Sequence, residues 1–231
     1  MSRQTSVLYG RDNEVIPILL GIHCSVDNPL ILDCTHNQGT MWKGLVSNNK
    51  SLWEMQYNVI RSDIDSGLNT IDVCSDFSCM PFVNKSIDVI VFDPPHLPTN
   101  AASKNSSKIW EQRYGITGTG EGRTGDNISG MFNSFLVEAK RVLKKNGIIL
   151  AKIADIVHNH RYQWHHVDFI NESQGVGMTA CDMLIKCDPN AGNLASSKWV
   201  NVMHLRKAHC YWIVVRNSNR CEKPSPYLTL P

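Results

Sequence analysis

Apolar and polar positions along this chain alternate with two different periods, and the changes of period mark the expected elements. Apolar residues recur at helical spacing over 15–24 and over 130–143, and further helices are expected to begin at Met41 and at His165. Asn146-Gly147 is expected to end the helix over 130–143. Short apolar runs that end in polar turns predict buried strands at 30–32, 58–60, 70–74, 87–92, 148–153, 178–186 and 208–216.

Strands that alternate with helices favour a mainly parallel sheet covered on both faces. The length of 231 residues is enough for one sizeable core and short for two. We therefore expect a single α/β domain over 1–231, with a helical lead-in over about 1–29 and a tail over 217–231. The segments 97–129 and 187–207 lack periodicity, and loops of this length inside a compact domain are often functional.

Composition narrows the class of protein. Apolar residues make up 42% and charged residues 19%, which excludes a wholly disordered or collagen-like chain. The longest apolar runs are far below the ~20 residues that a membrane span needs, and 1–5 lack the apolar core of a secretory signal. A soluble, cytoplasmic protein without a membrane partner is expected.

Charge is unevenly distributed. Seven Lys/Arg and two acids lie within 186–223, and four Lys/Arg and two acids lie within 97–125, whereas the rest of the chain is acidic. This pattern fits a polyanion-binding face, although surface scatter would also produce it. Both aperiodic segments coincide with basic stretches, so they are the candidate substrate-facing loops.

Eight cysteines and nine histidines require an explanation. Most of the cysteines fall in apolar strand-like runs, which indicates buried, reduced thiols, and no C-x2-C spacing suggests a zinc ribbon. The cysteines in apolar strand-like runs are Cys24, Cys74, Cys181 and Cys210. The histidines gathered between 158 and 166 could suggest a metal. They equally fit a polar loop before a helix, and we expect no metal site.

A polar turn follows the first predicted strand. Segment 33–40 reads Asp-Cys-Thr-His-Asn-Gln-Gly-Thr, so an acid ends the strand and a small-residue turn leads towards a helix. Gly39 would let a ligand lie against the backbone, and Asn37 readily adopts a positive φ. Ligands bind at such strand ends in parallel sheets. Alone, this turn fits a nucleotide-like ligand or any strand-to-helix connection.

Acids also follow the later strands. Asp63 and Asp76 come after the second and third, where carboxylates accept hydrogen bonds from ribose hydroxyls or an adenine amine, unless they are merely solvated loop acids. The sharpest signal is the segment Asp93-Pro94-Pro95-His96, which follows the strand over 87–92. The acid and the first proline carbonyl both accept hydrogen bonds from a planar amine, and an imidazole ring stacks on the base that bears it.

Taken together, these segments resemble the class I S-adenosylmethionine-dependent DNA amino-methyltransferases with a D/N/S-P-P-aromatic motif, which methylate adenine N6 or cytosine N4. The resemblance runs from about Leu30 to Arg216, and the segment 205–212 is similar to endings of small phage and bacterial members. It implies a Rossmann-like methyltransferase fold whose seven-stranded, mainly parallel sheet has a late antiparallel strand. It also implies S-adenosyl-L-methionine as cofactor and DNA as partner, with a monomer and a homodimer both open.

The resemblance assigns roles to matching positions. Catalysis falls to Asp93, Pro94, Pro95 and His96. Cofactor binding falls to Asp33, Thr35, Asn37, Gly39, Thr40, Asp63, Asp76 and Phe77. Nucleic-acid contacts are expected from Lys104, Lys108, Trp110, Arg113, Tyr114, Arg123, Lys198, Arg206 and Lys207. Two positions depart from the family pattern: Asn37 replaces a glycine, and His96 replaces a Tyr, Phe or Trp.

The implied activity is methyl transfer to the exocyclic amine of a base in DNA, with adenine N6 favoured. An RNA amino-methyltransferase acting on adenine N6 or guanine N2 would use the same chemistry. A non-catalytic methyltransferase-like partner subunit would tend to lose Asp33, Gly39 or Asp93, all of which are present. A dinucleotide-dependent oxidoreductase would need a G-x-G-x-x-G turn, which segment 33–39 lacks.

Overall fold

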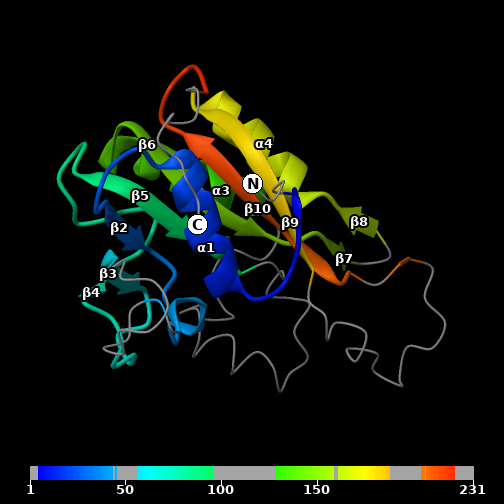
Figure 1. The fold of residues 1–231 in the computed structure, drawn as a ribbon, viewed down its shortest axis with the longest axis horizontal. Coiled ribbons are helices and arrows are strands. Elements are labelled where there is room, and N and C mark those ends of the chain that lie inside the picture. The colour runs from blue at the N-terminus through cyan, green and yellow to red at the C-terminus, as the bar shows by residue number, and fades with distance from the viewer. Residues whose placement is uncertain are drawn as a thin grey trace.

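The computed structural model describes residues 5–43, 45, 57–95, 128–158, 161–187, 204–205 and 207–221. A twisted eight-stranded sheet runs through these residues in the order β1-β9-β10-β6-β5-β2-β3-β4 (Figure 1). Its strands are β1 (Val7–Tyr9), β2 (Leu30–Asp33), β3 (Asn58–Asp63), β4 (Val73–Cys74), β5 (Ile87–Phe92), β6 (Leu143–Ile153), β9 (Thr179–Cys187) and β10 (His209–Arg216). The remaining elements are the hairpin β7 (Ile156–His158) and β8 (Arg161–Gln163), the helices α1 (Asp12–His23), α3 (Ile128–Val142) and α4 (His165–Gly175), and the 3-10 turn η1 (Thr40–Trp42).

The sheet is parallel from β4 to β6, and β10 then inserts antiparallel between β6 and β9. The strand order reverses at β2, which pairs with β3 on one side and with β5 on the other. At this switch point the turns after β2 and β5 leave the same edge of the sheet, which is where open α/β sheets bind ligands.

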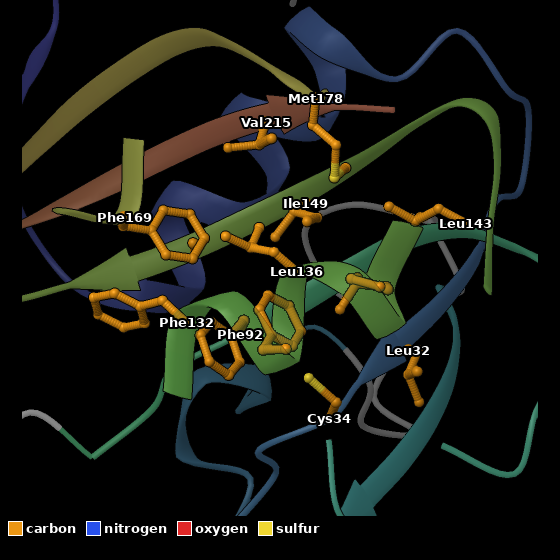
Figure 2. Packing of buried hydrophobic residues seen from close by; sticks show 14 of the residues in the cluster. Leu32, Cys34, Phe92, Phe132, Leu136, Leu143, Ile149, Phe169, Met178 and Val215 are labelled. Carbon is orange, nitrogen blue, oxygen red and sulfur yellow. The ribbon is translucent and has the colours of Figure 1, made fainter. Parts of the chain in front are cut away.

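Side chains of each strand alternate between two apolar layers, because successive residues of a strand point to opposite faces. One layer packs on α3 and α4 and includes the stacked rings of Phe92 and Phe135, whose centroids are 3.6 Å apart. Figure 2 shows Phe132 and Phe169 beside Phe92 in this layer. The other layer packs on α1 and is centred on Trp212. With both faces covered, β5 is buried along its whole length.

Most of the predicted elements are confirmed, and the fold class is the expected one. The strand over 87–92 has the predicted bounds. α1 begins three residues and α3 two residues before its predicted start, and each ends one residue before its predicted end. Where a helix was expected to begin at Met41, the described residues form the 3-10 turn η1, and residues 44 and 46–56 lie outside the described ranges. The expected helix stop at Asn146-Gly147 is wrong: α3 ends at Val142 and β6 begins at once, with Asn146 at φ 64° inside the strand.

Two features were not predicted. β1 adds an eighth strand by pairing in parallel with β9, since its three residues give too short a signal. The segment expected to be a histidine-rich polar loop forms the β7–β8 hairpin instead. Its alternation is confined to three residues a strand, which is below the length at which a period-2 pattern is recognisable.

The expectation of buried, reduced cysteines is only partly right. Cys34 and Cys210 are buried free thiols, but Cys74 and Cys79 are exposed. Cys181 forms a disulfide with Cys221, and the 5.5 Å between their Cα atoms lies within the usual range for such a bond. The pairing joins β9 to the segment after β10, two parts of the chain that are 40 residues apart.

The described residues contain neither a membrane span nor a metal cluster. None of the helices in this part of the chain is both long and apolar enough to span a membrane. His, Cys, Asp and Glu side chains within the described ranges form no group of three or more that could hold a metal ion.

Candidate active site

The turn after β2 is organised around the buried carboxylate of Asp33. Its Oδ2 accepts a hydrogen bond from Nε1 of Trp42 at 2.6 Å and lies 2.8 Å from Nδ1 of His36, while Oδ1 accepts the backbone N–H of Thr35 at 3.3 Å. These contacts tie the strand end to η1. Asp33 therefore shapes the predicted cofactor turn from inside the protein, and both of its oxygens are engaged in doing so.

The same turn needs two left-handed residues. Asn37 has a φ of 51° and Gly39 a φ of 64°, as expected for a turn in which Asn37 stands for a glycine. A Cβ at Gly39 would lie only 2.6 Å from Nε2 of His36. The sequence predicted that Gly39 would let a ligand approach the backbone. In the structure, the ring of His36 lies beside the backbone of Gly39. Thr40, the last residue of the predicted turn, is exposed.

Asp63 ends β3 beside this turn and is largely buried. Its Oδ2 accepts the backbone N–H of Asn37 at 2.7 Å, and its Oδ1 accepts that of Asp65 at 3.0 Å. Burial raises the pKa of the Asp63 carboxyl, and the two N–H groups oppose that shift. The next residue, Ile64, leaves 42% of its surface exposed although it is aliphatic. This strand end thus offers an acceptor and an apolar surface together.

Asp76 and Phe77 follow β4, and their side chains make different kinds of contact. Oδ1 of Asp76 accepts both the backbone N–H and the hydroxyl of Ser78, at 2.8 Å and 2.7 Å. The ring of Phe77 packs edge-on against Phe92, with centroids 5.3 Å apart, and against Phe135. Asp76 is therefore placed at the strand end, as predicted, whereas Phe77 is partly buried against the core beneath it.

The turn after β5 is joined directly to the turn after β2. The backbone N–H of Asp93 donates a 2.7 Å hydrogen bond to Oγ1 of Thr35, 58 residues earlier. Pro94 is buried and Pro95 half-buried. The predicted catalytic segment therefore lies at the switch point, in contact with the predicted cofactor turn.

A chain of alternating charges leads away from Asp93. Nζ of Lys152 donates to Oδ2 of Asp93 at 2.9 Å and to Oδ2 of Asp12 at 3.1 Å, and Nζ of Lys186 pairs with Oδ1 of Asp12 at 2.8 Å. Burial by itself would lower the pKa of the Lys152 amine, but the two carboxylates outweigh it and raise that pKa. Lys152 is therefore a permanent cation beside Asp93 at neutral pH.

Sequence reasoning missed this charge chain. Lys152 and Lys186 stand in β6 and β9, inside runs that read as apolar strands, and Asp12 begins α1. A lysine that interrupts an otherwise buried strand is a usable signal, because a buried charge needs a partner. That signal points to a partner without naming it, and the turn after β5 and the start of α1 supply the two acids.

The contacts above bring six of the predicted site residues together at or just after the carboxyl ends of β2, β3 and β5. These are Asp33, Thr35, Asn37, Gly39, Asp63 and Asp93. Of the residues expected to contact nucleic acid, Lys207 is described, and its Nζ lies 3.9 Å above the ring of Tyr162. The others lie outside the described residues, as does the predicted catalytic His96. These are Lys104, Lys108, Trp110, Arg113, Tyr114, Arg123, Lys198 and Arg206.

No protein-family model matches this sequence, and no curated protein matches it either. Solved structures do resemble it. A 1,6-didemethyltoxoflavin-N1-methyltransferase from Burkholderia thailandensis, with bound 1,6-didemethyltoxoflavin and S-adenosylhomocysteine, has a TM-score of 0.51 at 10% identity, over 90% of this chain and 76% of its own. The [4+2]-cyclase SpnF has a TM-score of 0.52 at 11% identity, over 89% of this chain and 81% of its own.

The chain has the fold of the class I S-adenosylmethionine-dependent methyltransferases. At these identities the likeness concerns the fold alone, and the cyclase illustrates that one fold carries different reactions. A candidate DNA modification methylase from Thermus thermophilus, complexed with S-adenosyl-L-methionine, matches with a TM-score of 0.39 at 14% identity. That match covers 65% of this chain, which spans only 55% of the methylase, and is too weak to bear on function.

Proposed function

We propose that this protein transfers a methyl group from S-adenosylmethionine to the exocyclic amine of a base in DNA, with adenine N6 as the target. The observation that carries the proposal is the position of Asp93-Pro94-Pro95. This segment follows β5 at the switch point, and its first backbone N–H is bonded to Thr35 of the predicted cofactor turn. Two segments that the resemblance links to catalysis and to cofactor binding are thus physically joined.

The residues at the neighbouring strand ends fit the proposed cofactor. Its ribose hydroxyls and adenine amine are hydrogen-bond donors, and carboxylates only accept. Each oxygen of Asp63 accepts one backbone N–H, so each keeps acceptor capacity. Exposed Ile64 beside it provides an apolar surface for the purine. When bound, the cofactor supplies an electrophilic methyl group on a sulfonium centre.

The chain's own groups would orient the target amine. An amine inside a stacked helix cannot be approached in line, so the base must leave the stack. The Asp93 carboxylate and the Pro94 carbonyl both accept hydrogen bonds from the two amine hydrogens and turn the nitrogen lone pair towards the methyl group. With the cofactor bound, its sulfonium centre would supply the methyl group to that lone pair, and solvent would take the proton that the methylated amine releases.

Lys152 limits what Asp93 does. With an ammonium group 2.9 Å from Oδ2, this carboxylate is held by a hydrogen bond and its charge is balanced. We therefore assign Asp93 the role of orienting the amine rather than that of removing its proton first. The basic segments of the sequence supply phosphate contacts, which provide affinity without sequence information.

The direct test is the transfer of a labelled methyl group from S-adenosylmethionine to unmodified duplex DNA, followed by nucleoside analysis of the product. Labelled N6-methyladenine is the expected product. Label in N4-methylcytosine would show that the target base is cytosine and not adenine. Label found in RNA alone would show that the substrate is RNA and not DNA. No label in either nucleic acid, with cofactor bound, would overturn the proposal.

Two variants test the role of Asp93 in the same assay. Asp93→Ala removes the acceptor, so transfer should fall at least about 100-fold while cofactor affinity stays within about threefold. Asp93→Asn keeps one acceptor oxygen and should retain more activity than Asp93→Ala. Near-wild-type transfer by Asp93→Ala would rule out this mechanism.

A further inference from the structure

An aromatic surface lies at the carboxyl end of β6, next to the strand that carries Asp93. There the β7–β8 hairpin leads into α4 (Figure 1). The rings of Tyr162 and Trp164 contact each other with centroids 4.1 Å apart and an interplanar angle of 35°. Trp164 leaves 54% of its surface exposed, although it is the largest apolar side chain. An indole in this position needs a reason, since tryptophan is mostly buried.

The surface is held in place from beneath. Asp155, which is buried, accepts a 3.1 Å hydrogen bond from the hydroxyl of Tyr162 and holds Nδ1 of His166 at 2.7 Å. The His166 ring in turn stacks on Tyr211, with centroids 4.1 Å apart. Burial and the Asp155 carboxylate raise the pKa of Tyr162 to about 12, so its hydroxyl keeps the proton that it donates. The rings are thereby fixed before any ligand arrives.

A cation completes the arrangement. Nζ of Lys207 lies 3.9 Å above the Tyr162 ring, within the range of a cation–π interaction. Tyr162 is thus covered by the ammonium group on one side and touched by the indole of Trp164, whose own surface stays open. An open aromatic face next to a positive charge matches a nucleotide, which has a stacking base and an anionic phosphate.

We propose that Trp164, Tyr162 and Lys207 form a binding site for one unpaired nucleotide of the DNA substrate, with the base stacked on Trp164 and the phosphate at Lys207. This proposal rests on the proposed function, because it places a substrate contact at the edge of the sheet that carries Asp93. A base that leaves the helix exposes unstacked neighbours, and an aromatic surface stabilises them regardless of their identity.

Binding of a fluorescein-labelled single-stranded DNA oligonucleotide of about 12 nucleotides, within the range of single-strand site sizes, tests the site by anisotropy without cofactor. Trp164→Ala should weaken binding about tenfold or more, the loss expected for one base–aromatic stack, and Trp164→Phe should restore most of it. Val83→Ala is the control, since Val83 is an exposed apolar residue four residues before β5, at the end of that strand away from Asp93. It should bind like the wild type.

The salt dependence separates the two contacts. Lys207→Ala should reduce the slope of log affinity against log salt by about 0.7, the value for one phosphate contact on a single strand, whereas Trp164→Ala should leave that slope unchanged. Binding by Trp164→Ala within twofold of the wild type, or an equal loss in Val83→Ala, would overturn the proposal. A loss seen with an RNA oligonucleotide of the same length and not with DNA would overturn the choice of DNA.

These outcomes are independent of the methyl-transfer assay. Loss of single-strand affinity in Trp164→Ala without any methylation of DNA by the wild type would refute the proposed function and support the nucleotide site. Methylation of DNA with unchanged affinity in Trp164→Ala would support the function and refute the site. Thermal unfolding of each variant checks that the exposed substitutions leave the fold intact.

Discussion

Oγ1 of Thr35 accepts the backbone N–H of Asp93 at 2.7 Å, and this hydrogen bond joins the turns that follow β2 and β5. The two turns leave adjacent parallel strands. The bond therefore fixes the distance between the segment that resembles a cofactor turn and the segment that resembles a catalytic motif.

Thr35→Val tests this link, because valine has nearly the same shape but no acceptor. The part-buried N–H of Asp93 would lose its partner, which typically costs about 1–3 kcal/mol of unfolding free energy. Thr35→Ser keeps the hydroxyl and should lose much less. Urea unfolding of both variants measures the difference, and equal stability of the valine and serine variants would show that the bond is unimportant.

Gly39→Ala should destabilise the turn for two reasons. An alanine at φ 64° costs about 1–2 kcal/mol, and its Cβ would lie 2.6 Å from Nε2 of His36. Gly175→Ala is the control, since no atom lies within 4 Å of the added methyl, and it should be neutral or slightly stabilising. Thermal unfolding compares the two. A Gly39→Ala variant as stable as Gly175→Ala would contradict the turn geometry.

Lys152→Met should lower stability at neutral pH and reduce transfer, because Asp93 and Asp12 would keep their charges without the cation between them. Loss of hydrogen bonds to a charged group costs about 1.5–3 kcal/mol. Lys152→Arg keeps the charge, so its stability should lie between those of the wild type and Lys152→Met. Chemical unfolding gives the free energies, and unchanged stability in Lys152→Met would show that the charge chain contributes nothing.

The same ion pairs predict a pH dependence. Burial would lower the pKa of Lys152, but Asp93 and Asp12 raise it above its unfolded value. A raised pKa in the folded state means that the stabilisation is complete below the ordinary lysine pKa of about 10.4 and disappears as pH rises through the higher native value. The stability difference between wild type and Lys152→Met should therefore be constant from about pH 7 to about pH 10 and shrink only above that. A difference that disappears by about pH 9 would refute it.

The rate at which each cysteine is alkylated should depend on how deeply its thiol is buried. Burial raises the pKa of Cys210 to about 11 and that of Cys34 well above its ordinary value, so neither forms the reactive thiolate at about pH 8. Exposed Cys74 and Cys79 should react first with iodoacetamide. Peptide mass mapping of the native protein identifies the modified sites, and the reduced, unfolded protein should label at all eight cysteines.

Cys181 and Cys221 should behave differently from the free cysteines in the same alkylation experiment. As a disulfide they should stay unlabelled in the native protein until a reductant is added. Labelling of either one without reductant would show that the pair is not bonded, and labelling of Cys210 before Cys74 would contradict the burial argument.

Sequence pattern predicted most of the sheet because its central strands are buried on both faces. A strand such as β5 is then a continuous apolar run with a polar end, and the acids that follow such runs reach one edge. For this reason Asp63 and Asp93 could be assigned to the same site from the sequence. Periodicity failed where an element has only three residues, as in β1 and β7, or where a strand follows a helix directly, as at Leu143.

Contacts that depend on tertiary packing could not be predicted from the sequence. The partners of Lys152 come from α1 and from the end of β5, 140 and 59 residues away, and no local pattern links these positions. Similarly, the Asp155 contacts that fix Tyr162 and His166 depend on a hairpin that was expected to be a loop. His36 was predicted as part of a ligand-facing turn, yet its ring fills the space beside Gly39.

Both outer strands of the described sheet are very short: β1 has three residues and β4 has two, whereas the inner strands β9, β10 and β6 have eight to eleven. A long open edge is a template on which a second chain adds a strand, and it is a common starting point for aggregation. β1 pairs with β9 over Ile185–Cys187 and so covers this part of the backbone on which a second chain could add a strand. Deleting residues 1–10 would uncover β9 and should therefore show itself first as a loss of solubility at high concentration.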